Sequence, residues 1–222
     1  MIVFFDLDDT LIDSQGAVGE AVRKIHFDLQ VKQSLEDFLG AWRAAHAHRY
    51  PRYLDGHLSY QDASRMRVRD ALGANVTDSE ADAVFERYMR AYELNWALFS
   101  DVRPCLSALR GTRLGVISNG PSKEQRRKLT QLGIEPSFER IVISEECGCA
   151  KPNAGIFARA CELANVAAHD AWYVGDNFEI DYGGATAAGL RAVWLNRRGE
   201  KPQTNSHIVT SLTQVPNVIA SA

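Results

Sequence analysis

The chain begins with a short apolar run that leads directly into a cluster of acidic residues. Met-Ile-Val-Phe-Phe at residues 1–5 is followed by Asp6-Leu-Asp8-Asp9-Thr10. The run has the length and composition of a β-strand, so Asp6 and Asp8 are expected at its carboxyl end, where open α/β sheets bind their ligands. Residues two apart on an extended backbone point the same way, so both carboxylates are able to face one ligand. Because two close carboxylates repel each other unless a cation or a shared proton intervenes, the pair indicates a reactive site.

Composition and charge exclude several classes of protein. The chain has 222 residues, of which 45% are hydrophobic and 24% are charged, and its net charge is −3. These values are typical of a globular protein and do not suggest a surface for nucleic acid or an anionic membrane. The apolar start is broken at Asp6, which does not fit a signal peptide, and no apolar stretch reaches membrane-spanning length. We therefore expect a cytoplasmic protein without nucleic-acid or membrane partners, whose oligomeric state the sequence does not indicate.

The four cysteines are expected to be free thiols. Cys105, Cys147, Cys149 and Cys161 occur in a chain with no export signal, which favours a reducing compartment. Cys147-Gly-Cys149 has the form of half a metal site, but no second ligand pair with suitable spacing accompanies it. The sequence therefore favours an oxygen-rich site over a cysteine-ligated metal.

Residues 14–98 have the pattern of helices throughout. Apolar side chains recur at helical spacing, as in Val18, Val22, Ile25 and Leu29. The segment Thr77-Asp-Ser-Glu80 is a capping box for the last helix, and the pattern over residues 59–72 is weaker. Pro51 and Gly56 indicate a loop in the middle of the region. This region predicts about four helices and no strand.

After residue 100, short apolar strands alternate with helices. Strands are expected at 113–118, 140–144, 171–175 and 191–195, and helices at 122–133, 153–165 and 178–189. Such alternation predicts a parallel sheet covered by helices on both faces. The strand at residues 2–6 has no partner before residue 113. We therefore predict a Rossmann-like, doubly wound α/β core of residues 1–13 and 99–222, interrupted by a four-helix domain of residues 14–98.

Polar residues occur at the ends of the predicted strands and at the helix starts that follow them. They form four groups, namely Asp6 with Asp8, Ser118-Asn119-Gly120, Lys151-Pro152, and Gly175-Asp176 with Asp181. The segment Ser122-Lys-Glu-Gln125 has the form of a capping box that opens a helix. In a doubly wound sheet these groups converge on one edge, where a hydroxyl, free amides and a helix N-terminus favour an oxyanion.

The residues expected to converge comprise four carboxylates, one lysine and one hydroxyl, but no histidine. The lack of histidine argues against a Ser-His-Asp hydrolase and against a histidine-ligated zinc site. Oxygen-rich ligand sets suit Mg²⁺, which pairs with one or two carboxylates and with phosphate oxygens of a substrate. The lysine suits a phosphoryl group, and a carboxylate is a recognised nucleophile in covalent phosphoryl transfer.

In this order, the four groups resemble the motifs of the haloacid dehalogenase-like hydrolase superfamily, the first motif being Phe5-Asp6-Leu-Asp8-Asp9-Thr10-Leu11. Each motif alone is weak, but four in order with strand context are specific. The helical insert directly after the first motif resembles the branch with a C1-type helical cap, so the resemblance spans nearly the whole chain. It implies that residues 14–98 form the cap, that Mg²⁺ is the cofactor and that the substrate is a small phosphate ester.

The resemblance also implies a role for each motif residue. Asp6 matches the nucleophile that forms an aspartyl-phosphate, and Asp8 matches the general acid and base. Ser118 and the Asn119 backbone match the position that binds the phosphoryl group. Lys151 matches the residue that neutralises the charge of the nucleophile and the phosphate.

The metal site is implied in the same way. Asp176 matches the acidic Mg²⁺ ligand, and Asp6 and the Asp8 carbonyl complete the protein's share. Asp181 matches a second acidic position that orients the metal shell or the motif lysine. Thr10 is expected to support the loop through its hydroxyl, and the neighbouring Asp9 is expected to bond to backbone amides of the loop.

Several activities of the family remain open at this stage. Dehalogenases expel halide without a proton and typically lack an acid at the position of Asp8, so phosphomonoester hydrolysis is the leading hypothesis. A phosphomutase and a catalytically idle binding module are the alternatives. The cap lysines Lys24 and Lys32 lack a context that would suggest the Schiff base of the phosphonate-cleaving branch.

The substrate itself is not predicted by the sequence. Trp42, His46, Arg49 and Tyr53 recur at helix-like spacing, interrupted at Pro51. Either they form a polar and aromatic lip over a substrate, or Trp42 belongs to the core and the others to a solvated face.

Overall fold

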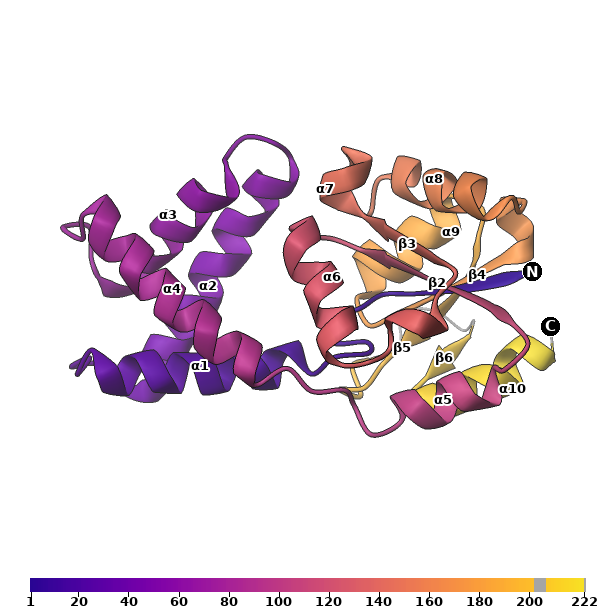
Figure 1. Ribbon diagram of the computed structural model, residues 1–222, viewed down its shortest axis with the longest axis horizontal. Helices are drawn as coiled ribbons and strands as arrows, with labels where there is room; N and C mark the ends of the chain where they lie inside the picture. Colours follow the sequence, from indigo (N-terminus) through magenta and orange to yellow (C-terminus); the bar gives the residue numbers. More distant parts are fainter. Residues whose placement is uncertain (202–206, 222) are drawn as a thin grey trace. The chain divides into compact units, whose positions relative to one another are not determined.

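The computed structural model describes residues 1–201 and 207–221 of the chain. The chain forms two compact units, one of Met1–Asp13 with Leu98–Ala222 and the other of Ser14–Ala97. The first is an α/β unit and the second is helical (Figure 1). Among the described residues, no helix combines the length and the apolar character needed to cross a bilayer.

The α/β unit is built on one parallel sheet of six strands. The strands are β1 (Ile2–Phe5), β2 (Arg113–Ser118), β3 (Arg140–Ile143), β4 (Ala171–Gly175), β5 (Arg191–Leu195) and β6 (Ile208–Val209), in the order β3-β2-β1-β4-β5-β6. In the register of the sheet, Phe5 of β1 pairs with Val116 of β2 and with Val174 of β4. The strand order reverses between β1 and β4, and open sheets bind ligands at the carboxyl ends of strands at such a point. The prediction of a doubly wound parallel sheet is confirmed.

Helices cover both faces of this sheet (Figure 1). They are α5 (Val102–Ala108), α6 (Ser122–Gln131), α7 (Ser144–Cys147), α8 (Ala154–Ala164), the π-helix η3 (Phe178–Gly183), α9 (Gly184–Ala187) and α10 (Val215–Ala220), with 3-10 turns at Glu135–Ser137, Ala168–Asp170 and Leu212–Gln214. Phe4 of β1 packs with Phe157 of α8 in one core, and Phe5 packs with Leu129 of α6 in the other. Every residue of β1 is buried, as expected of a central strand in a parallel sheet.

The helical unit contains α1 (Ser14–Asp28), α2 (Leu35–Leu54), α3 (Tyr60–Leu72) and α4 (Asp78–Leu94). The predicted capping box is present at Thr77, whose side chain and Glu80 exchange hydrogen bonds with each other's backbone. The predicted loop is present at Gly56, which lies in the turn after α2, but its start at Pro51 is wrong, because α2 continues through this residue. The helix persists for one more turn because the Pro51 carbonyl accepts a hydrogen bond from the Asp55 N–H at 2.9 Å.

Trp42 belongs to the core of the helical unit. Its side chain is fully buried, and the guanidinium of Arg67 lies 4.8 Å from its ring centroid and 5.0 Å from that of Tyr88. Arg49, which is half-buried on the same helix, forms an ion pair with Asp70 of α3 at 2.7 Å. The interpretation that places Trp42 in the core is therefore correct for this residue, whereas His46, Arg49 and Tyr53 are half-buried and do not form a fully solvated face.

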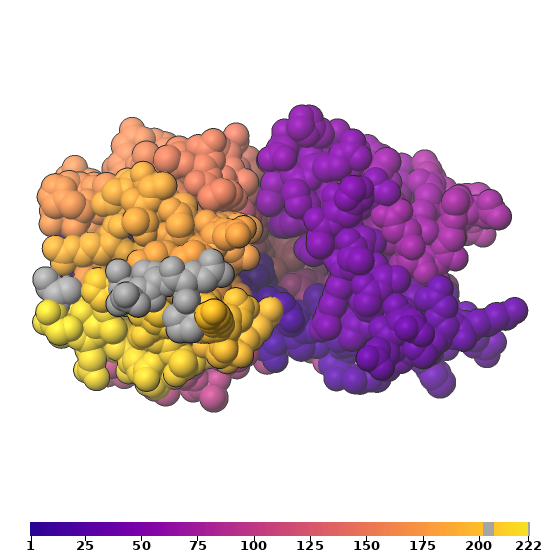
Figure 2. All heavy atoms as spheres, turned by 180° about the vertical axis from the view of Figure 1, so that it is seen from behind, coloured from indigo at the N-terminus to yellow at the C-terminus, as the bar shows by residue number. Residues whose placement is uncertain are grey.

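The C-terminal segment contacts the rest of the α/β unit through one partly buried carboxylate, that of Asp101. Asp101 accepts hydrogen bonds from Arg197 at 2.8 and 2.9 Å, from the Ser211 hydroxyl at 2.9 Å and from the Leu212 N–H at 2.9 Å. Arg197 also donates to the Thr10 carbonyl at 2.9 Å. The C-terminal residues, yellow in Figure 2, lie on the surface of this unit. None of these contacts was predicted, because their residues are far apart in sequence.

We expect the substitution Asp101→Asn to lower the free energy of unfolding by about 2–3 kcal/mol, since it weakens charge-assisted hydrogen bonds and leaves Arg197 without its carboxylate. Burial alone would raise the pKa of Asp101, but hydrogen bonds from Arg197, Leu212 and Ser211 lower it below its ordinary value. The stabilisation is therefore present above about pH 4 and is lost as the pH falls through the lowered pKa. Urea unfolding of both proteins between pH 7 and pH 3 measures this difference.

The exposed Asp55 provides the matched control for this experiment. Asp55→Asn is expected to change stability by less than about 0.5 kcal/mol at every pH. A difference between Asp101→Asn and the wild type that grows toward low pH would contradict the assignment.

Candidate active site

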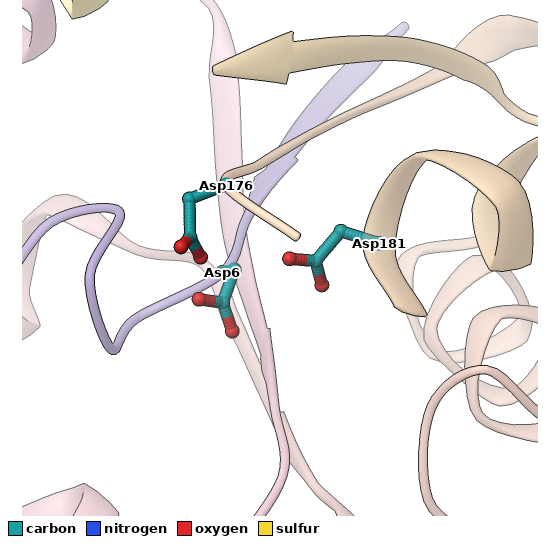
Figure 3. A group of neighbouring side chains, drawn as sticks. All are labelled: Asp6, Asp176 and Asp181. Carbon is teal, nitrogen blue, oxygen red and sulfur yellow. The ribbon is translucent and has the colours of Figure 1, made fainter. Parts of the chain in front are cut away.

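Three carboxylates meet at the carboxyl ends of the central strands. Asp6 directly follows β1, Asp176 directly follows β4, and Asp181 lies in η3 (Figure 3). One carboxylate oxygen from each residue lies within 4.8 Å of those of the other two. Asp6 and Asp176 meet because β1 and β4 are neighbouring parallel strands in register. The structure therefore brings together all three of these residues that the sequence analysis selected.

Lys151 inserts its ammonium among these acidic groups. Its Nζ atom lies 2.5 Å from Asp6 Oδ1, 2.7 Å from Asp181 Oδ1 and 2.7 Å from the Tyr173 hydroxyl. Burial alone would lower the pKa of Lys151, but the carboxylates of Asp181 and Asp6 raise it above its ordinary value. The side chain therefore remains a cation and bridges two of the carboxylates.

One ammonium does not balance the charge of three carboxylates, of which Asp6 and Asp181 are buried and Asp176 is half-buried. Burial raises the pKa of Asp6 to about 7, with a further contribution from Asp181, although Lys151 opposes the shift. Burial, Asp6 and Asp181 likewise raise the pKa of Asp176 to about 8. Such shifts indicate a site that is short of positive charge, and a divalent cation with a preference for oxygen ligands would supply it. The donor set fits Mg²⁺.

Tyr173 is a member of the site that sequence reasoning missed. In addition to accepting from Lys151, its hydroxyl lies 3.0 Å from Asp181 Oδ1 and 3.1 Å from the Ile117 carbonyl oxygen. The residue lies within the apolar strand β4, where a tyrosine is ordinarily a core residue, so no sequence signal separated it from its neighbours. Its phenol links β4 to the lysine and to Asp181.

Asp181 also depends on a glycine and on the start of η3. The Asn177 N–H donates to Asp181 Oδ2 at 3.0 Å. A Cβ atom added at Gly175 would lie 2.4 Å from Asp181 Cγ, so Gly175 leaves the space that the carboxyl group occupies. The glycine of the fourth motif therefore has a packing role beside the acid.

Thr10 is in direct contact with Asp176. Its hydroxyl accepts from the Asp176 N–H at 3.0 Å and lies 3.4 Å from Asp176 Oδ1. Asp9 has a positive φ of 61° and donates its N–H to the Ile12 carbonyl at 2.7 Å. Its carboxylate lies 3.8 Å from Arg198. Thr10 thus ties the loop after β1 to the loop after β4.

The Asn119 side chain is paired with the backbone of the lysine. Its Nδ2 donates to the Lys151 carbonyl at 2.9 Å, and its Oδ1 accepts from the Lys151 N–H at 2.8 Å. This reciprocal pair joins the loop after β2 to the loop before α8. Ser118, the last residue of β2, is buried at the same end of the sheet.

The Asp8 carboxylate contacts two side chains of α6, and its charge also contributes to the raised pKa of Asp6. The Asp8 carboxylate lies 2.8 Å from the Lys128 ammonium and 2.8 Å from the Gln125 amide nitrogen. The capping box predicted at Ser122 is wrong. The N-cap of α6 is Pro121 without a side-chain bond, because Ser122 bonds to Glu146 and Gln125 turns inward.

The cysteines are all free in the structure. Cys147 and Cys149 place their sulfur atoms 3.3 Å apart, whereas Cys105 and Cys161 are buried. Within residues 1–201 and 207–221, the acidic group of three is the only cluster of histidine, cysteine or acidic side chains with the spacing for a metal ion. Among the described residues, the cysteine pair therefore does not belong to a group of ligands that could hold a metal ion.

Comparisons with known proteins agree on one family. The sequence model of the haloacid dehalogenase-like hydrolases matches residues 1–189. N-acylneuraminate-9-phosphatase of Mus musculus is 30% identical over 99% of this chain and 93% of its own, and glyceraldehyde 3-phosphate phosphatase of Methanopyrus kandleri is 33% identical over 88% and 83%. The magnesium-bound structure of the HAD-hydrolase YfnB of Bacillus subtilis superposes with a TM-score of 0.86 at 22% identity, covering 99% and 98%.

Replacing Gly175 by alanine, which adds one methyl group, tests the packing of this glycine against Asp181. We expect Gly175→Ala to lower the free energy of unfolding by about 1–3 kcal/mol, since the new Cβ forces Asp181 away from Lys151. Gly183→Ala is the control, because its Cβ would meet its nearest atom, the Phe178 carbonyl oxygen, at 3.4 Å. Thermal and urea unfolding compare the two variants. Equal stability of the two would show that the space beside Gly175 is not restricted.

Proposed function

The chain belongs to the haloacid dehalogenase-like hydrolase family and is an enzyme of the phosphatase type, and we propose that it is a Mg²⁺-dependent phosphomonoesterase that acts through an aspartyl-phosphate. The observation that carries the proposal is the contact of buried Lys151 with Asp6, beside Asp176 and Asp181. This arrangement gathers a nucleophile, a fixed cation and a set of metal ligands at one point. Phosphatases among the sequence relatives support the same activity.

In the proposed first step, an Asp6 carboxylate oxygen attacks the phosphorus of the substrate. The bond between phosphorus and the ester oxygen breaks, and Asp8 donates a proton to the departing alkoxide. Lys151 orients the Asp6 carboxylate and stabilises the charge that spreads over the phosphoryl oxygens. Ser118 and the Asn119 N–H are the donors proposed to hold these oxygens.

In the second step, water attacks the phosphorus of the aspartyl-phosphate and gives its proton to Asp8. The bond between phosphorus and Asp6 breaks, which restores the carboxylate and releases inorganic phosphate. Asp6, Asp176 and the Asp8 carbonyl are the proposed ligands of Mg²⁺, and Asp181 acts through Lys151. When bound, Mg²⁺ supplies positive charge to the transferring phosphoryl group.

The helical unit is the proposed cap. It follows the first motif directly, as in the C1 branch of the family, and its closure would exclude water and select the substrate. The proposed substrate is a small phosphate ester, and the names of the relatives make phosphorylated sugar derivatives the first class to test. A phosphomutase would instead return an isomer of the sugar phosphate, and separation of isomer from free phosphate distinguishes the two.

We expect Asp6→Asn to abolish phosphate release, with a loss of at least about 10³-fold, because an amide does not replace the carboxylate as a nucleophile. The measurement is release of inorganic phosphate from a panel of sugar phosphates, nucleotides, flavin mononucleotide and small phospho-acids. Asp170→Asn, at an exposed aspartate, is expected to behave as the wild type. Substantial phosphate release by Asp6→Asn would rule out the aspartyl-phosphate mechanism.

We expect removal of divalent cations by EDTA to abolish the activity and added Mg²⁺ to restore it. Binding of Mg²⁺ is also expected to raise the melting temperature of the wild type, since it relieves the repulsion between Asp6 and Asp176. Asp176→Asn is expected to weaken this thermal shift, whereas Asp170→Asn is not. Activity that survives in EDTA would contradict the metal assignment.

A further inference from the structure

Helix α6 carries a buried ammonium whose position is not explained by the fold. The Lys128 side chain is 2% exposed, and its Nζ lies 2.8 Å and 3.0 Å from the two oxygens of Asp8 and 2.9 Å from Glu124 Oε1. Taking an ammonium out of water is costly unless paired groups compensate it. An apolar residue at this position would complete the core without that cost. The location of Lys128 is therefore better explained by its contact with Asp8 than by packing.

Gln125 reaches the same carboxylate from the same face of α6. Its Nε2 atom lies 2.8 Å from Asp8 Oδ2, 2.7 Å from Ser118 Oγ and 2.9 Å from the Asn119 carbonyl oxygen. Residues three apart lie on one face of a helix, which explains why Lys128 and Gln125 converge. Because the amide donates to Ser118 Oγ, the Ser118 hydroxyl hydrogen remains available for an acceptor outside this group.

We propose that Lys128 and Gln125 are positioning residues of the reaction, which together fix the Asp8 carboxylate and the Ser118 hydroxyl from α6. This inference rests on the proposed function, in which Asp8 transfers protons and Ser118 binds the phosphoryl group. Lys128 contacts both oxygens of Asp8 and so restricts the rotation of the carboxylate. Gln125 contacts both Asp8 and Ser118. One side chain therefore holds the residue that transfers the proton and the hydroxyl that binds the phosphoryl group.

The contact also gives Asp8 a cation other than Lys151. Asp6, Asp176 and Asp181 lie together around Lys151, whereas Asp8 has a separate cation and is not a member of that group. A carboxylate that must exchange protons with a leaving group and with water requires an orientation that is fixed before the substrate arrives. The Glu124 carboxylate also contacts the Lys128 ammonium, at 2.9 Å, so the lysine is not held by Asp8 alone.

The test compares two halves of the reaction with p-nitrophenyl phosphate in the presence of Mg²⁺. Nitrophenolate leaves without a proton, so phosphorylation of Asp6 does not require a positioned Asp8, whereas hydrolysis of the aspartyl-phosphate does. For Lys128→Met we expect a nitrophenolate burst of about one per active site, followed by steady-state turnover reduced at least about tenfold in kcat. KM is expected to fall with kcat, so that kcat/KM, which reports on phosphorylation of Asp6, changes little. Gln125→Met is expected to show the same loss of turnover together with a slower burst, because it also removes the contact with Ser118. Lys128→Arg, which retains the charge, is expected to recover part of the turnover.

Lys123→Met is the matched control, since Lys123 is exposed on the same helix. It is expected to retain wild-type turnover, and the melting temperatures of all variants report on folding. Turnover of Lys128→Met within about twofold of the wild type, or a burst that declines in proportion to turnover, would overturn the inference and leave the proposed function intact. Failure of the wild type to release phosphate from any ester would overturn the proposed function, and the inference with it.

Discussion

The buried ion pairs of Lys151 are the interaction on which the rest of the site depends. Its ammonium joins a carboxylate that follows β1, a phenol within β4 and a carboxylate in η3. Each of these groups would be costly to bury alone, and the removal of one partner from such a set leaves an uncompensated charge. The strand order provides the meeting point, because β1 and β4 are neighbours where the sheet changes direction. The Lys151 nitrogen therefore contacts side chains from both central strands and from η3, at the point where the strand order reverses.

Several small contacts keep this ammonium in place. Asn119 pairs with both backbone polar groups of Lys151, which ties the lysine's loop to the end of β2. Thr10 joins the loops after β1 and β4 through the Asp176 N–H. Gly175 leaves the volume that Asp181 fills. Each contact involves a motif residue whose side chain does not need to touch a substrate, which explains why the motifs contain more residues than the chemistry uses.

The carboxyl ends of the strands were predictable, because each strand is a short apolar run that stops at polar or glycine residues. Apolar runs that end at or next to a carboxylate predict that Asp6 and Asp176 lie at the same edge of the sheet. The partners of Asp8 were not predictable in this way, because they depend on the rotation of α6 about its axis. Gln125 fitted a capping box by spacing, yet its amide is buried and Ser122 bonds elsewhere. The contacts of Asp101 with the C-terminal segment were missed for a related reason, since loop closure over a hundred residues leaves no local pattern.

The two lysines give Asp6 and Asp8 different cationic partners. Asp6 and Asp8 are two residues apart after the same strand, and in the sequence they look equivalent. In the structure, Asp6 shares Lys151 with Asp181, and burial among acids raises its pKa to about 7. Asp8, which does not belong to the acidic group of three, contacts Lys128 at 2.8 Å. Two carboxylates from one motif therefore acquire different partners and are able to perform different chemistry. The difference in partners depends on α6 as much as on the first motif. The residues that set the surroundings of Asp8 therefore include Lys128 and Gln125 in the helix after β2.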